Sequence, residues 1–181
     1  MIIRRNNSTT LSVDSSIDKT AVSIKNLDGQ LLIKINNGSK DIEISKPGDY
    51  EYFGVGVTGF EIPTELYSGV INIIKLNVDG VKVVITTQVK EIPKDILNSL
   101  VNIDILAIPL VNANATKPLV NSIEPKKLVI IKSFGGEEVE LDTVYKSVGI
   151  TSMQEVTSVK HKSADFATVS ENTILIGELL A

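Results

Sequence analysis

Short β-branched segments separated by turn dipeptides fill the first 86 residues, and this pattern constrains the fold more than any other feature. Asp28-Gly29, Asn37-Gly38 and Asp79-Gly80 each predict a tight hairpin turn, because such residue pairs adopt positive φ at little cost. The segments between the turns predict strands: Ile2–Arg5, Thr10–Val13, Thr20–Ile24, Gln30–Ile35, Asp41–Ile44, Val70–Val78 and Val81–Thr86. We therefore expect the front half to consist almost entirely of β-structure.

Beyond Thr86 the pattern changes to alternating helices and strands. Units of strand, helix and strand place apolar strands side by side in a sheet that helices cover. The expected elements are a helix starting at Pro93, a strand over Asp104–Pro109, a helix opened by Thr116 and Pro118, a strand over Lys127–Ile131, a helix capped by Asp142 and a strand over Thr173–Ile176. The sequence predicts a single α/β domain over residues 1–181, an αββα-type sandwich of two facing mixed β-sheets with helices on the outer faces.

Composition excludes several classes of protein. The chain has a net charge of −4 and no cysteine, and its arginines are Arg4 and Arg5 alone. A nucleic-acid-binding protein normally carries a basic stripe with interleaved aromatic residues, so we expect no nucleic-acid partner. Without cysteine there is no disulfide and no thiolate metal site. No apolar run approaches the roughly 18 residues of a membrane span, and no signal peptide precedes the first strand, so a cytoplasmic protein is expected.

The segment Pro47–Phe60 combines a turn with a glycine-rich strand pair. Pro47-Gly48 predicts a tight turn, since proline presets φ and glycine accepts a positive φ. The glycines at 54, 56 and 59 indicate a bend or a close approach of neighbouring backbone.

This segment resembles the Pro-Gly-Glu-Tyr-Glu-x-x-Gly-Val-x-x-x-Gly signature of small metallo-β-lactamase-fold hydrolases, in the branch related to lactonases. Four further segments are similar to other stretches of that family and occur in the same order: Asp79–Ile85, Val101–Pro109, Ile123–Ile131 and Leu141–Ile150. The resemblance implies a metallo-β-lactamase-like fold and a hydrolase ancestor.

In that family the strand ends carry metal ligands, and here the corresponding residues are of other types. The resemblance places these vestigial positions at Asp28, Ile85, Gln88, Lys132 and Ser133. A hydrolytic zinc centre needs about three imidazole or carboxylate ligands around an open position. The chain has one histidine, and a lysine at a ligand position opposes cation binding. We therefore expect no bound metal, no other cofactor and no catalytic residue.

Three other groups could carry chemistry. His161 lies between two lysines and is expected to be a surface residue, although it could act as a general base. Lys132-Ser133 beside Gly135-Gly136 could hold a phosphate or carboxylate, or could form a solvated turn. The acidic run from Glu137 to Asp142 could bind a hard cation loosely, but a solvated loop ending in a helix cap is favoured.

A cluster of aromatic residues stands out in a chain otherwise poor in them: Tyr50, Tyr52, Phe53, Phe60 and Tyr67. These side chains either fill the sheet interior, which is favoured, or form an association patch.

Two functional hypotheses follow. The first is a metal-free, non-catalytic module that binds an unknown protein partner or forms a homo-oligomer. The alternative is a metal-independent hydrolase or lyase that uses the vestigial cleft around Lys132 on a small anionic substrate.

Overall fold

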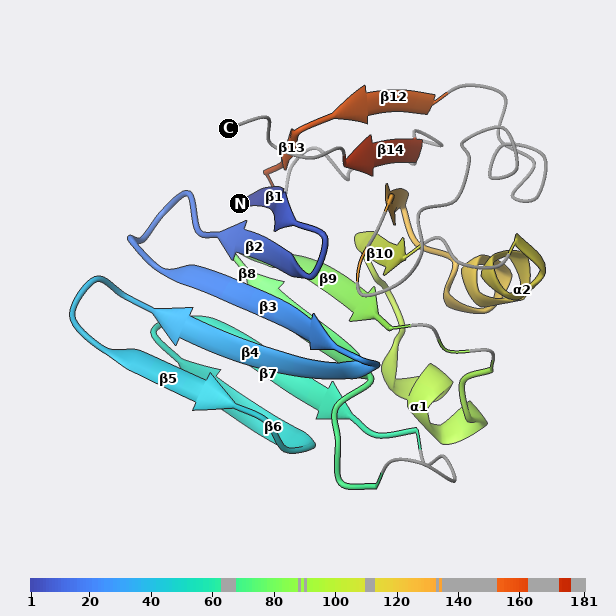
Figure 1. Ribbon diagram of the computed structural model, residues 1–181, viewed down its shortest axis with the longest axis horizontal. Helices are drawn as coiled ribbons and strands as arrows, with labels where there is room; N and C mark the ends of the chain where they lie inside the picture. Colours follow the sequence, from blue (N-terminus) through green and yellow to red (C-terminus); the bar gives the residue numbers. More distant parts are fainter. Residues whose placement is uncertain are drawn as a thin grey trace.

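The computed structural model of the 181-residue chain describes residues 1–62, 68–87, 89, 91–109, 113–132, 134, 153–162 and 173–176 (Figure 1). Residues 113–117, 153–155 and 173–176 are described by their backbone alone. The helix predicted after Asp142, and the site candidates Gln88 and Ser133, lie outside the described residues, as do Tyr67 and the acidic run.

Five strands from the first 44 residues and one strand from residues 158–160 build a six-stranded sheet, which we call sheet A. Its order is β13 (Ser158–Lys160), β1 (Ile2–Asn7), β2 (Thr10–Asp14), β3 (Ala21–Leu27), β4 (Gln30–Asn36) and β5 (Asp41–Ile44). Every pairing in sheet A is antiparallel. Short turns connect only antiparallel strands, so Asp28-Gly29 and Asn37-Gly38 account for the β3–β4 and β4–β5 pairings.

The second sheet, sheet B, is mixed. Its order is β12 (Met153–Val156), β14 (Thr173–Ile176), β11 (Lys127–Ile131), β10 (Ile105–Pro109), β9 (Val81–Thr86), β8 (Ile73–Val78), β7 (Val55–Phe60) and β6 (Gly48–Tyr52). The strands from β6 to β9 pair antiparallel, and those from β9 to β12 pair parallel. The predicted sandwich of two facing sheets is confirmed.

The predicted turns at Asp28-Gly29 and Asp79-Gly80 are confirmed. Asn37-Gly38 belongs to a four-residue connection, residues 37–40, in which Gly38 has a φ of 86° and Asn37 has no positive φ. Several strand boundaries differ from the prediction by one to three residues. Asp28 and Gly29 have φ of 50° and 92°, and Asp79 and Gly80 have φ of 55° and 75°. β3 continues to Leu27 instead of ending at Ile24, because its pairing with β4 extends as far as the turn. β8 begins at Ile73 rather than Val70, since the preceding residue, Asn72, bonds to other segments.

The chain passes from one sheet to the other at both edges. Residues 45–47 connect β5 of sheet A to β6 of sheet B, and Thr157 alone separates β12 from β13. Both crossings tie the edge strands of the two sheets together, and Figure 1 shows β5 and β6 side by side.

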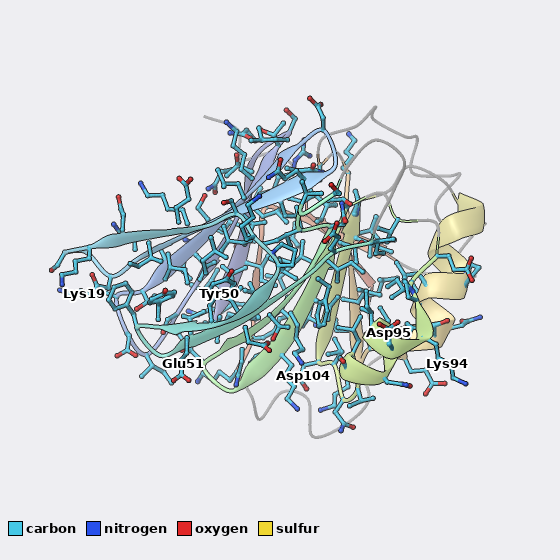
Figure 2. All side chains as sticks on the ribbon, turned by 90° about the horizontal axis from the view of Figure 1, so that it is seen from below. Lys19, Tyr50, Glu51, Lys94, Asp95 and Asp104 are labelled. Atoms are coloured by element: carbon cyan, nitrogen blue, oxygen red, sulfur yellow. The ribbon has the colours of Figure 1, made fainter. Side chains whose placement is uncertain are left out.

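Two apolar layers hold the fold together. The larger fills the space between the sheets with inward-facing residues such as Ile24, Leu76 and Val129. The second lies between sheet B and the helices α1 (Lys94–Ser99) and α2 (Ala113–Ile123), and includes Val84 and Ile130. Figure 2 shows Lys94 and Asp95 of α1 on the far side of sheet B from sheet A.

Both described helices therefore lie on one outer face of the sandwich, and no described helix covers sheet A. α1 follows Pro93 as predicted. α2 begins at Ala113, earlier than the predicted start at Thr116 and Pro118, so Pro118 lies inside the helix. Proline favours the first helical turn, which is why the sequence placed the start too late. Among the described residues no helix has the length and apolar character needed to cross a membrane.

The glycine-rich segment forms the hairpin of β6 and β7, as predicted. Its turn is Phe53-Gly54, with φ of 52° and 75°. Tyr50 and Phe53 pack against the core between the sheets, and Phe60 packs against the helix-side layer, so the favoured core position is confirmed for them. Tyr52 is 36% exposed.

Candidate functional site

The carboxyl ends of the parallel strands β9, β10 and β11 meet at one edge of sheet B, the edge where open α/β sheets place their ligands. Ile85 is fully buried in the core between the sheets and offers only hydrocarbon. Thr86 and Thr87 are also buried, at 1% and 4% exposure. Lys132 follows β11 directly and is half-buried.

Asp28 lies at the same end of the molecule but in sheet A. It is exposed and forms the β3–β4 turn with Gly29. The carbonyl oxygen of Gly29 accepts a hydrogen bond of 2.9 Å from Asn72 Nδ2, and the carbonyl oxygen of Asn72 accepts one of 2.9 Å from the Thr87 backbone. Two of the predicted positions, Asp28 and Ile85, thus lie at one end of the sandwich, with Asn72 linking their strands.

Asn72 is a central residue of this end, and the sequence analysis missed it. It is 5% exposed, and its Oδ1 accepts a 2.9 Å hydrogen bond from the backbone of Ile62. Its backbone also donates to the carbonyl of Phe60 at 3.0 Å. One asparagine therefore joins the β3–β4 turn, the end of β7 and the end of β9.

Asn26, the penultimate residue of β3, makes a second hydrogen-bonded connection between the two sheets at this end. It is 2% exposed, and its Nδ2 donates a 2.6 Å hydrogen bond to the carbonyl of Phe134. Its Oδ1 accepts a 3.0 Å bond from the backbone of Gly29. Because Asn26 belongs to sheet A and Phe134 follows β11 of sheet B, this bond also crosses between the sheets.

Phe134 fills the interior next to the position where the resemblance placed the last metal ligand. It is 1% exposed and belongs to the core between the sheets. We name Asn26, Asn72 and Phe134, with their hydrogen bonds, the asparagine clasp. The clasp occupies the end of the sandwich with side chains whose polar atoms are already bonded to the protein.

Comparison with known proteins gives one clear structural likeness. No family model matches the sequence, and no curated protein matches it. A solved structure from Thermotoga maritima, of a protein assigned as a zinc-dependent hydrolase of the metallo-β-lactamase superfamily, superposes with a TM-score of 0.71. The match covers 98% of this chain and 98% of that chain at 13% identity. The chain has the metallo-β-lactamase fold. At this identity the likeness shows the fold alone, and it confirms the fold implied by the segment Pro47–Phe60.

The metallo-β-lactamase fold of the relative is associated with zinc, and the residues at the clasp do not fit that ion. Zinc is held by imidazole, thiolate or carboxylate groups. The clasp offers amides whose oxygens already accept backbone hydrogen bonds, and Thr86 and Thr87 at the end of β9 offer hydroxyls. Among the described residues no group of three or more histidine, cysteine, aspartate or glutamate side chains could hold a metal.

His161 lies at the other end of the fold, and the expectation that it is exposed was wrong. It is 6% exposed, and its backbone exchanges two 3.0 Å hydrogen bonds with the backbone of Met1. His161 follows β13 directly, and β13 pairs with β1 so that Lys160 lies opposite Ile2. Met1 also contacts Asp79, at the opposite end of β8 from Asn72, so His161 lies far from the clasp.

A separate open groove of about 460 Å³ lies on the outer face of sheet A. Its lining includes the small residues Ser12, Ala21 and Ser23. Ion pairs flank it, Arg4 with Asp14 on one side and Lys34 with Asp41 at 2.7 Å on the other. The hydrogen bond with Lys34 lowers the pKa of Asp41. These charges are paired with each other, and the groove is not the site that the sequence predicted.

Proposed function

We propose that this chain is a non-catalytic, metal-free protein of metallo-β-lactamase fold that acts in the cytoplasm as a binding or assembly module. The observation that carries the proposal is the asparagine clasp. Asn26 and Asn72 are almost fully buried, and Phe134 fills the space beside them. A hydrolase needs an open position for substrate and an activated water, whereas the clasp contributes buried, hydrogen-bonded amides and a buried phenyl ring at this end.

The ionisable groups at this end also support a non-catalytic role. Threonine hydroxyls and asparagine amides do not ionise near neutral pH, so Thr86, Thr87, Asn26 and Asn72 offer no general acid or base. Asp28 is exposed on its turn. Lys132, half-buried after β11, is the group on which the alternative depends, a metal-independent hydrolase or lyase for a small anionic substrate.

Exposed apolar side chains at the other end support binding to a protein partner or to a second copy. Ile17, in the β2–β3 loop, is 77% exposed, and Tyr52, beside Phe53, is 36% exposed. The two segments adjoin, since the Thr20 hydroxyl donates a 3.4 Å hydrogen bond to the Phe53 carbonyl. Contiguous apolar patches left in water are typical of association sites, so we place the contact surface of the module on these two segments.

Metal analysis combined with a hydrolysis screen tests the proposal. We expect no stoichiometric zinc after purification in zinc-containing buffer, and no turnover of phosphate or carboxylate esters. Turnover that is lost in Lys132→Ala but kept in the matched surface variant Lys94→Ala would establish the alternative. Stoichiometric, tightly held zinc would overturn both. A concentration-dependent mass by light scattering that Tyr52→Ala abolishes would favour self-association over a different partner.

A further inference from the structure

The contact surface at the end opposite the asparagine clasp consists of two unlike halves. The β2–β3 loop presents Ile17, which is 77% exposed, and the β6–β7 hairpin presents Tyr52, which is 36% exposed. The ring of Tyr52 lies beside that of Phe53, with the two centroids 6.5 Å apart. One half is therefore aliphatic and the other aromatic.

The β2–β3 loop is held in shape by hydrogen bonds within the loop and to sheet B. Ser15 Oγ accepts bonds from the backbone of Ile17 at 3.1 Å and of Asp18 at 2.9 Å. Asp79, in the β8–β9 turn, accepts bonds of 2.6 Å from Ser15 Oγ and of 2.6 Å from the Ser16 backbone. Burial acts to raise the pKa of Asp79, but these hydrogen bonds help to hold it well below its ordinary value, so the acceptor stays charged. A loop that is ordered before its partner arrives loses less entropy on binding.

Each half also presents an exposed charge, and the two charges are opposite. Lys19 belongs to the loop and Glu51 to β6. Figure 2 shows both on the side of the molecule away from the helices. Within the part of the chain that the structure describes, neither residue forms an ion pair. Asp18, the other charge of the loop, is directed at its own hairpin, since its Oδ2 would lie 3.7 Å from a Cβ at Gly54.

We propose that this end of the sandwich is a two-fold interface with a second copy of the chain, an inference that rests on the binding role proposed above and names its partner. A two-fold axis uses the same patch on both copies, so the loop of each copy lies against the hairpin of the other. Ile17 then packs on Tyr52 of the second copy, and Lys19 faces Glu51 of the second copy. The axis repeats both contacts.

The complementarity of the two halves favours a second copy over a different protein. The loop combines an aliphatic side chain with a cation, and the hairpin combines an aromatic pair with an anion. Each half thus supplies what the other half binds. The apolar contacts provide buried area, and the charge pairs fix the relative orientation of the copies.

Charge exchange tests this arrangement. In Lys19→Glu two copies meet with glutamate against glutamate, and in Glu51→Lys with lysine against lysine. Each variant alone is expected to dimerise at least about 10-fold more weakly than the native chain. An equimolar mixture of the two variants should dimerise about as tightly as the native chain, because both charge pairs are then restored. Sedimentation velocity over a series of concentrations measures the dissociation constants.

Lys94→Glu is the matched control, because Lys94 is an exposed lysine on α1, away from this end. It should dimerise as the native chain does. All three substitutions replace exposed side chains, so each variant should keep the urea midpoint of the native chain.

Two results would overturn the interface. One is a native chain that stays monomeric up to about 100 μM, and the other is a mixture of Lys19→Glu and Glu51→Lys that associates no more tightly than either variant alone. A monomeric chain without zinc or turnover overturns this interface and leaves the non-catalytic role, with a different protein as partner. Stoichiometric zinc or ester hydrolysis overturns that role whatever the mass of the particle.

Discussion

Gly59 on β7 lies against the side chain of Ile71, so an added Cβ would force that side chain to shift. A Cβ at this position would be 2.9 Å from Ile71 Cδ1, whereas a Cβ at Gly56 on the same strand would be 3.5 Å from Asn77 Cβ, an ordinary contact. Neither glycine has a positive φ, so the two positions differ in space and not in backbone strain.

We predict that Gly59→Ala lowers the free energy of unfolding by roughly 1–3 kcal/mol, because Ile71 is fully buried and has to shift within a close-packed core. Gly56→Ala, the matched control, should change it by less than about 0.5 kcal/mol. Urea denaturation of both variants measures the difference. Equal losses of unfolding free energy in the two variants would mean that the close contact with Ile71 is not what requires glycine at position 59.

The depressed pKa of Asp79 predicts how stability depends on pH. A carboxyl group whose pKa is lower in the folded protein stabilises it fully above the unfolded pKa, near 3.9, and the contribution declines as pH falls toward the folded pKa. We predict that the native chain is more stable than Asp79→Asn at pH 7 and that the difference narrows below about pH 4. Urea unfolding at several pH values checks this, and a difference that stays constant down to pH 2 would contradict it.

At the scale of single elements, the turns and the apolar strands could be predicted from sequence, but the residues that close the strand ends could not. Asp28-Gly29 forms its turn for local reasons, and Ile85 is buried because it belongs to an apolar strand. Asn26 bonds to a carbonyl 108 residues away and Asn72 to one 43 residues away. No local pattern encodes such pairs. Asn72 nevertheless interrupts an apolar run, and that was a usable signal.

We predict that Asn72→Ala lowers the free energy of unfolding by roughly 2–4 kcal/mol, since it leaves the Gly29 carbonyl and the Ile62 amide without their partner. Asn77→Ala is the matched control, because Asn77 is an exposed asparagine on the adjoining strand β8. Its effect should stay within about 0.5 kcal/mol. Chemical denaturation measures both, and a clasp variant as stable as the control would show that Asn72 does not hold this end together.

At the scale of the whole molecule, the two sheets are tied to each other at both ends by different chemistry. The clasp uses neutral amides around Asn26 and Asn72, and the other end uses the ion pair of Met1 with Asp79. Asn72 and Asp79 flank β8, whose residues Ile73–Val78 separate them by about 20 Å at the usual rise of a strand. Filling one end with amides leaves the fold intact because the apolar layer between the sheets does not depend on a metal.

This arrangement predicts which pairs of substitutions interact. Asn72 and Asp79 share no hydrogen-bond partner, so the unfolding free-energy losses of Asn72→Ala and Asp79→Ala should add within about 0.5 kcal/mol. Asn26 and Asn72 both bond to Gly29, one to its amide and the other to its carbonyl, so Asn26→Ala and Asn72→Ala should deviate from additivity by more than about 0.5 kcal/mol. Urea denaturation of the native chain, the two single variants and the double variant in each cycle measures both couplings. Two results would contradict this arrangement. One is a strong deviation from additivity between Asn72→Ala and Asp79→Ala, and the other is full additivity between Asn26→Ala and Asn72→Ala.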